Sequence, residues 1–464
     1  MKIFRKAIPT IKKLKTGGTS LLLFDGKKDY AYQASLEDVQ TALNAFAPVA
    51  ESGSGGGWLI PETAFIQPGV TGGTVGDGNA PFPTHTAAIA AGANSFILLP
   101  GNYSEQFDLV SGASYYSYEG VTFVAGGITA TTDQAGTKWL GNADFIGAFE
   151  MIYFNSSVDL VDVEIEFNEI EETAGAARGL TLKAGNFDTG LNVPANLSSV
   201  SVKGKKFTGV GGNGYGLSVR GRLGGTIHID EIYGDYSVIS SYEHEDATLL
   251  ISFNKLAVRN VGSAGNLAQY KQAFISYNSY ATSNITLRGD IYNEVVSLMA
   301  SNGATVTAWT GNLGTVTIEG DIYALNNRGI LCTAGTIVHN GNLKSLDRAY
   351  VIDGAGKIDA VNSVVEQGKT CTIGGTGELS IINSTIKSTA VDHIIDVVTS
   401  TAVVRITNSI LEGTSGVCVE HNATTPTIAF QGNVSSNLAN SSFTDACSPT
   451  GFTQQTGLVA PSVV

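Results

Sequence analysis

The chain has 464 residues and a formal net charge of −14, and its 56 glycines and 15% charged residues are typical of a turn-rich, all-β protein. The negative charge argues against a nucleic-acid partner, because phosphate binding requires a basic face. No apolar run reaches the roughly 18 residues of a membrane span, so we expect no membrane insertion. The four cysteines show no metal-ligand spacing, and we expect neither a metal nor a cofactor.

Residues 1–57 are expected to form a small N-terminal anchor module that ends in a flexible linker. A basic stretch precedes a short strand at residues 21–24, and an apolar helical stripe follows Ser35. The glycine and serine run at residues 52–57 has the composition of a linker. The apolar segment before Pro9 is too short for a signal-peptide core, so we expect no export by the general secretory route. The basic residues are either a solvated tail or a peg that docks on an acidic partner.

Residues 58–119 are expected to form a cap and the start of a repeating structure. They contain Gly76-Asp77-Gly78, an alanine-rich helix at residues 86–91, an apolar strand at residues 96–99 and the turn Pro100-Gly101-Asn102-Tyr103. A helix laid over the open end of stacked strands covers unpaired strand edges and apolar core, both of which invite aggregation.

A nine-residue phrase then returns every 21 residues. GTVTIEGDI begins at Gly314, and related phrases begin at Gly335, Gly356 and Gly377. The third residue of each phrase is aliphatic and the fifth mostly so, which is the pattern of a half-buried strand. A repeat of this length predicts a parallel β-helix, in which each repeat forms one coil of a solenoid. The solenoid is expected to cover residues 120–441, and residues 442–464 are expected to form a C-terminal cap or tail.

The seventh position of each phrase predicts a bend between two strands. It is always glycine or asparagine, the residues that most readily adopt a left-handed backbone. Positive φ or a tight turn is therefore expected at each of these structural bends: Gly320, Gly341, Asn362, Asn383 and, in a later copy, Asn408.

Further copies of the pattern extend the solenoid in both directions. Upstream we align Ile285, Leu287 and Gly289, and, with slippage, Ile227, Ile229 and Asp230; the earliest copy is Tyr116, Tyr118 and Gly120. The spacing widens on both sides of Gly289, which predicts projecting loops there.

The cap motif and the repeats together resemble the pectin-lyase-like β-helix proteins, especially phage tailspikes. One departure is the segment Pro83-Thr84-His85-Thr86, which replaces the family's usual Asp-Asp-Thr before the helix. The resemblance implies a right-handed parallel β-helix and a homotrimer. It also implies a place in a virion assembled in the host cytoplasm, with residues 1–57 attached to other virion proteins.

The pectin-degrading signatures of this fold are absent, and the candidate carboxylate pair is Asp290 and Asp321. These two residues follow equivalent bends, so in adjacent coils they would stand about 5 Å apart, as the carboxylates of retaining glycosidases do. The alternative is a pair of solvated turn residues.

Three other sets of residues are singled out. The run Glu243-His244-Glu245-Asp246 is either an acid/base or metal site or an exposed loop, and a histidine among acids should have its charged form favoured. His339 is expected to be a core histidine. The cysteines Cys332, Cys371 and Cys418 are expected to be buried thiols, since aliphatic residues surround them.

Aromatic residues are the candidates for glycan binding. Tyr233, Tyr292 and Tyr323 each lie three residues past a bend and should align on one lateral face, with Trp309 in an insertion beside them. Sugars stack on exposed rings, and a tyrosine hydroxyl adds a hydrogen bond. The alternative is a structural stack between coils.

These observations predict a phage virion structural protein, a tailspike or a head or tail fibre, whose lateral face binds a host surface polysaccharide. The first alternative is a glycan depolymerase of the same fold, either a hydrolase or a lyase. The second is a purely structural decoration protein without a ligand.

Overall fold

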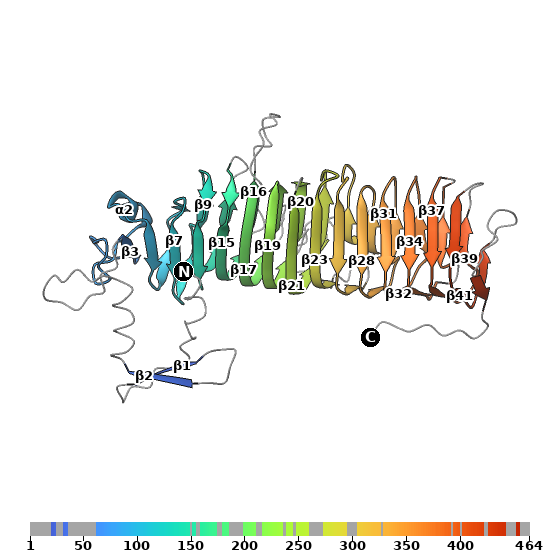
Figure 1. The fold of residues 1–464 in the computed structure, drawn as a ribbon, viewed down its shortest axis with the longest axis horizontal. Helices are drawn as coiled ribbons and strands as arrows, with labels where there is room; N and C mark the ends of the chain where they lie inside the picture. Colours follow the sequence, from blue (N-terminus) through green and yellow to red (C-terminus); the bar gives the residue numbers. More distant parts are fainter. Residues whose placement is uncertain are drawn as a thin grey trace.

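The computed structural model is a parallel β-solenoid of about 11 turns with almost no helix (Figure 1). The predicted fold class is thereby confirmed. The structure describes residues 62–148, 151–154, 158–173, 179–184, 198–209, 216–234, 238–244, 247–258, 272–294, 304–325, 328–390, 393–399, 401–421 and 426–441, together with the strands at 20–24, 31–35 and 452–454. Within these residues, no helix is long and apolar enough to cross a membrane.

Each coil contributes strands to three sides of the solenoid. Strands of the first side are β3 (Thr63–Ile66), β4 (Ser95–Leu98), β7 (Ser114–Ser117), β11 (Lys138–Gly141), β25 (Thr315–Glu319), β28 (Thr336–Asn340), β31 (Lys357–Val361), β34 (Glu378–Ile382), β37 (Val403–Thr407) and β40 (Thr427–Gln431). Strands of the second side are β5 (Gly101–Tyr103), β8 (Val121–Phe123), β12 (Asp144–Gly147), β26 (Ile322–Ala324), β29 (Leu343–Ser345), β32 (Val364–Gln367), β35 (Thr385–Ser388), β38 (Ile410–Glu412), β41 (Val434–Ser436) and β43 (Phe452–Gln454).

In the middle of the rod, single long strands run through the bend and belong to both of these sides: β15 (Val163–Glu172), β17 (Ser198–Gly209), β19 (Leu223–Gly234), β21 (Thr248–Val258) and β23 (Asn284–Asn293). The third side is a separate sheet. Its strands are β6 (Phe107–Asp108), β9 (Ile128–Ala130), β13 (Ile152–Phe154), β16 (Leu180–Ala184), β18 (Leu217–Gly221), β20 (Ile239–His244), β22 (Phe274–Tyr277), β24 (Ala304–Ala308), β27 (Arg328–Cys332), β30 (Tyr350–Ile352), β33 (Cys371–Ile373), β36 (Ile395–Val397), β39 (Val417–His421) and β42 (Ala439–Ser441).

Four of the described strands lie outside these sheets, and the two ends of the chain are described only in part. The short strands β10 (Gln134–Ala135) and β14 (Leu160–Val161) pair with each other in parallel. Near the N-terminus, β1 (Ser20–Phe24) and β2 (Ala31–Ser35) form an antiparallel pair. The helix expected after Ser35 and the linker lie outside the described residues. In the C-terminal segment 442–464, β43 adds a further strand beside β41, and the remainder lies outside the described residues.

The solenoid interior is filled by columns of aliphatic and aromatic side chains. The repeat residues Val316, Ile337, Ile358 and Leu379 stack in register and are at most 2% exposed. In the N-terminal coils the column is aromatic: the ring centroid of Tyr115 lies 4.7 Å from that of Phe96 and 5.4 Å from that of Trp139. Burying such columns against each other is the main stabilising contribution to a solenoid.

The expected cap helix is present as α2 (His85–Ala90), with Thr84 as its N-cap residue. The Thr84 side chain accepts a hydrogen bond from the Ala87 amide, and Glu105 accepts bonds from the amides of His85 and Thr86. His85, in the segment before the helix, has a structural role, because its ring is buried and stacks on Phe107 with a centroid separation of 4.4 Å.

The asparagines at the bends have the expected left-handed backbone. The φ angles are 51° at Asn362, 50° at Asn383 and 48° at Asn408. Gly320 has a φ of 158°, and the chain bends at Gly341, although this residue is not among those with a left-handed backbone. Glycine is needed at 341 because a Cβ there would lie only 2.1 Å from the Gly320 carbonyl oxygen.

A serine follows each of these asparagines and links successive coils. The amide of Ser363 donates to Oγ of Ser384 at 3.0 Å, and the amide of Ser384 donates to Oγ of Ser409 at 3.1 Å. All three serines are buried. The Asn-Ser pair is thus a unit, in which asparagine supplies the bend and serine satisfies a buried amide of the preceding coil.

Two of the sequence alignments are wrong in register. Tyr116 and Tyr118 point outward and are 46% and 45% exposed, whereas Tyr115 and Ser117 are buried. In the second alignment, Ile227 is placed at the first apolar position of its copy, which Ile285 occupies. In the structure Ile285 pairs with Leu249, and Leu249 pairs with Gly225. Ile227 therefore occupies the second apolar position. Strand β21 belongs to a coil that the sequence pattern missed. The loops expected around Gly289 fall at residues 259–271 and 295–303, which lie outside the described residues.

Candidate functional site

A polar depression lies where β15, β17, β19 and β21 bend between the first and second sides. It has a volume of about 440 Å³, and we call it the corner groove; its lining residues are Asn168, Glu169, Lys205, Lys206, Asp230, Glu231 and Asn254. Because the bend turns these side chains outward at the same place in four successive coils, the residues form one continuous strip along the rod.

Hydrogen bonds between coils hold the polar groups of the corner groove in place. The Lys205 ammonium donates to Oδ1 of Asn168 at 2.8 Å, and Lys206 pairs with Glu169. Within strand β19, the Tyr233 hydroxyl donates to Oε2 of Glu231 at 3.2 Å. Carboxylate, amide and ammonium groups therefore present both donors and acceptors to a ligand.

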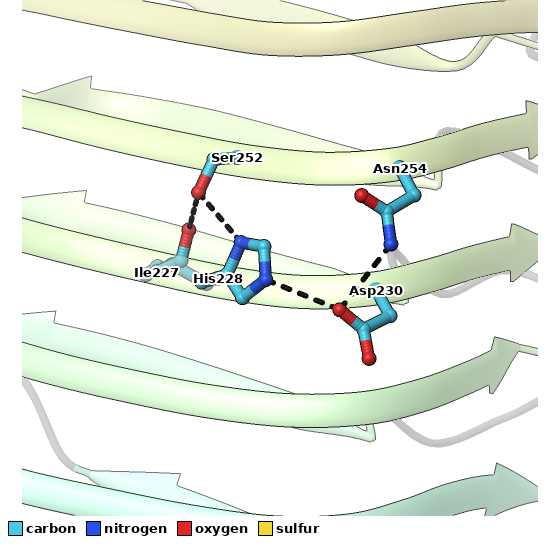
Figure 2. A network of polar contacts seen from close by, with 5 residues as sticks. All are labelled: Ile227, His228, Asp230, Ser252 and Asn254. Carbon is cyan, nitrogen blue, oxygen red and sulfur yellow. Dashed lines mark hydrogen bonds and ion pairs between the residues drawn. The ribbon is translucent and has the colours of Figure 1, made fainter. Parts of the chain in front are cut away.

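Beside the groove, Ser252, His228 and Asp230 form a hydrogen-bonded chain on the outer surface (Figure 2). Nδ1 of His228 lies 2.9 Å from Oγ of Ser252, and Nε2 lies 3.1 Å from Oδ1 of Asp230. The side chains of His228 and Asp230 are 47% and 44% exposed. Asn254 donates to the same Asp230 oxygen at 3.4 Å. The Ile227 carbonyl oxygen, 3.4 Å from Oγ of Ser252, is a second acceptor for the serine hydroxyl.

The sequence did not predict this hydrogen-bonded chain of Ser252, His228 and Asp230. His228 and Ser252 are 24 residues apart and are register partners on adjacent parallel strands. The available signal was His228 two residues before Asp230 in one strand, with a serine at the equivalent place in the next coil. That coil is β21, which the repeat pattern missed.

The three candidate tyrosines do share one outward column on the second side. The register runs from Tyr233 through Ala257 to Tyr292 and Tyr323. The rings of Tyr292 and Tyr323 are stacked, with centroids 4.9 Å apart and planes 12° apart. Nζ of Lys255 lies 4.7 Å from the Tyr292 centroid and 5.8 Å from the Tyr233 centroid. The ring faces thus contact one another and a cation, as the structural alternative expects.

Ionisation of this column is shifted by its surroundings. Desolvation first, and then the Asp321 carboxylate, raise the pKa of Tyr323 to about 12. The hydrogen bond from Lys255 to Glu294 raises the pKa of the ammonium group, so the cation between the rings is retained at neutral pH.

Trp309 does not belong to the tyrosine column, and its expected place beside the tyrosines is wrong. It follows β24 of the third side and packs against a small buried cluster, separate from the main core, of Ala304, Leu331 and Val351. The repeat pattern does not specify to which side of the solenoid a residue in an insertion belongs, and Trp309 directly follows a strand of the third side.

Asp290 and Asp321 lie on adjacent coils, and each carboxylate accepts a hydrogen bond from the backbone of the next coil. The Asp321 amide donates to Oδ1 of Asp290 at 3.3 Å, and the Asn342 amide donates to Oδ1 of Asp321 at 2.8 Å. The Asn342 side chain and the Tyr323 hydroxyl donate to the other oxygen of Asp321 at 3.2 and 3.3 Å. This arrangement links coils and satisfies bend amides.

The run that begins at Glu243 is not a cluster in the part that the structure describes. His244 is fully buried and bonds to Oγ of Ser283 and the carbonyl oxygen of Leu223, and burial lowers its pKa, contrary to the expectation that its charged form is favoured. Glu243 has a φ of 49° and pairs with Arg220. Residues 245 and 246 lie outside the described residues. Elsewhere in the described ranges, no group of three or more His, Cys, Asp or Glu side chains is arranged to hold a metal ion.

Comparison with known proteins gives no relative for this chain. No protein-family model, curated protein or solved structure matches it.

Proposed function

We propose that the corner groove binds a linear, hydroxyl-rich polysaccharide laid along the side of the solenoid. The observation that carries this proposal is the groove itself, in which side chains from four successive coils line one polar depression. Coils spaced by about 4.8 Å give such a strip a length of about 15 Å. That length suits an extended chain better than a small metabolite.

The chemistry of the groove suits sugar hydroxyl groups. Each hydroxyl both donates and accepts hydrogen bonds, and the groove offers carboxylates, amides and ammonium groups in alternation. Its three carboxylates outnumber its two lysines, and the whole chain is strongly acidic. Charge complementarity therefore favours a neutral polysaccharide over a polyanion.

The tyrosine column takes a smaller part in this proposal than the sequence suggested. Because the faces of Tyr292 and Tyr323 are in contact with each other, a sugar cannot stack between them. The column offers ring edges and hydroxyl groups at the rim, beginning with Tyr233 beside Glu231. Trp309 has no part in it.

For the biological setting we propose a phage virion protein, a tailspike or a head or tail fibre, assembled in the host cytoplasm and acting as a homotrimer. This part of the proposal rests on the sequence resemblance and on the elongated solenoid. Residues 1–57 would attach the chain to other virion proteins. A chain that lacks residues 1–57 should still fold as a solenoid but should not be incorporated into particles.

The two alternatives differ from this proposal in what happens to the polysaccharide. Both Asp290 and Asp321 accept hydrogen bonds from bend amides, which favours a structural role for the two carboxylates. These bonds therefore argue against a depolymerase that uses this pair. A decoration protein would bind no glycan at all.

An array of purified bacterial surface polysaccharides, neutral and anionic, tests the proposal. The protein should be retained on neutral polysaccharides, and prolonged incubation should release no oligosaccharides. Released fragments would favour the depolymerase, and retention on no polysaccharide would favour the decoration protein.

A further inference from the structure

The Ser252, His228 and Asp230 chain has a chemistry that glycan binding does not need. Binding requires donors and acceptors, but here a serine hydroxyl, an imidazole and a carboxylate are joined in sequence by contacts of 2.9 and 3.1 Å (Figure 2). In such a chain the imidazole can take the serine proton while the carboxylate stabilises the resulting cation.

The proton positions allow this use. When the Ser252 hydroxyl donates to Nδ1 of His228, the proton on Nε2 is donated to Asp230. The ring nitrogens are used in the opposite order from the usual serine triad, in which Nε2 faces serine. Asn254 donates to Asp230 as well and helps to fix that carboxylate.

The surroundings supply the other parts of a hydrolytic site. Arg288 is the register partner of Ser252 on the next coil, and its Nε donates to Glu319 at 2.7 Å. The backbones of Arg288 and Ser252 lie about one strand spacing apart. In this proposal the Arg288 guanidinium group, which also pairs with Glu319, is the cation that stabilises an oxyanion. The corner groove begins at Asp230 and Asn254, so the remainder of a substrate has a place to lie.

We propose that Ser252, His228 and Asp230 form an acyl-ester hydrolase site, and that its substrate is an O-acetyl group carried by the polysaccharide in the corner groove. The Ser252 oxygen bonds to the acetyl carbon, and His228 takes the serine proton. The bond from that carbon to the sugar oxygen breaks, and His228 returns the proton to this oxygen. Water then attacks the acetyl-serine in the same way, which releases acetate and restores Ser252. The polysaccharide backbone stays intact.

The choice of a sugar ester rests on the proposed function, but the nucleophile is tested without a glycan. The full chain is treated with a fluorophosphonate probe, and the labelled peptide is identified by mass spectrometry. Hydrolysis of p-nitrophenyl acetate is measured in parallel. We expect labelling at Ser252, and we expect the hydrolysis rate to fall about a hundred-fold or more in Ser252→Ala and His228→Asn.

A matched control is Ser201→Ala, which removes an outward serine of β17, on the same side of the solenoid. It should keep full labelling and full hydrolysis. Because the His228 side chain is nearly half exposed and Ser201 and Ser252 are only partly buried, we expect these variants to melt at the temperature of the unmodified chain. Absence of label at Ser252, or labelling that is unchanged in a folded His228→Asn variant, would overturn the proposal.

The same variants separate this inference from glycan binding. Ser252→Ala should retain polysaccharide binding while it loses acetate release from an O-acetylated polysaccharide. Binding without ester cleavage by the unmodified chain would contradict the hydrolase site alone. Cleavage of the small ester by a chain that binds no polysaccharide would support Ser252 as the nucleophile and contradict the proposed function.

Discussion

Nδ1 of His339 lies 2.9 Å from the Tyr350 hydroxyl in the interior of the solenoid, where both side chains are buried. Desolvation lowers the pKa of His339 from 6.5 to about 4. The same cause lowers the pKa of His85, under the cap helix, to about 4. Both rings are therefore neutral in the folded protein at neutral pH.

These two histidines predict a loss of stability in mild acid. Between about pH 6.5 and pH 4 the unfolded chain binds more protons than the folded chain, so stability falls as the pH falls through this window. Each histidine contributes on the order of 3 kcal/mol over the full window. Thermal melts from pH 7 to pH 4.5 should show a steeper fall for the unmodified chain than for His339→Gln. Parallel curves would contradict a neutral buried His339.

The left-handed backbone at Asn383 should be strained by a β-branched side chain, although the position is not buried. Its side chain is exposed, and its φ is 50°. Replacement by valine should destabilise the protein by roughly 1–2 kcal/mol, because a β-branched residue disfavours a left-handed backbone. Asn383→Gly tolerates that backbone and is the control. Equal melting temperatures of the two variants would show that the bend imposes no such requirement.

Asp321 should act in stability rather than in catalysis. Asp321→Ala removes the acceptor of the Asn342 amide and should cost about 1–3 kcal/mol, whereas Asp321→Asn keeps one acceptor oxygen and should cost less. Melting temperatures of both variants test this order. If the unmodified chain released oligosaccharides and Asp321→Asn did not, the carboxylate would be catalytic and this interpretation would be wrong.

Three cysteines should be unreactive in the folded chain. Cys332, Cys371 and Cys418 are buried, and burial raises the pKa of each thiol to about 12. The thiolate is the reactive form, so a Cys447→Ser variant should not react with Ellman's reagent at pH 8 until guanidinium chloride unfolds it. Rapid reaction of the native variant would show that the interior opens.

The sequence predicted the solenoid well where its repeat is regular. Between Val316 and Leu379 the 21-residue period places both the core column and the bends, because every coil uses the same bend residue types. The pattern failed at β21, where bulky Phe253 stands at the bend position. It also failed at Tyr116, because that strand carries a tyrosine on each face, with Tyr115 buried and Tyr116 exposed.

The candidate site could be predicted only in part. The alignment of Tyr292 with Tyr323 follows from the coil register, but the contact between their faces depends on side-chain rotamers that no spacing reveals. The Ser252 and His228 pair depends on the coil that the pattern missed. Trp309 was misplaced because an insertion of irregular length precedes it.

The central claim is that polysaccharide lies in the corner groove, and the measurement that tests it most directly is the dissociation constant of groove variants. For a polysaccharide identified on the array, Glu231→Gln should weaken binding about ten-fold, or 1.4 kcal/mol, because it changes a carboxylate at the groove wall. Glu412→Gln, on β38 outside the groove, should bind as the unmodified chain does. Unchanged binding by Glu231→Gln and by a Lys205→Ala variant, with both proteins folded, would place the ligand elsewhere and contradict the account.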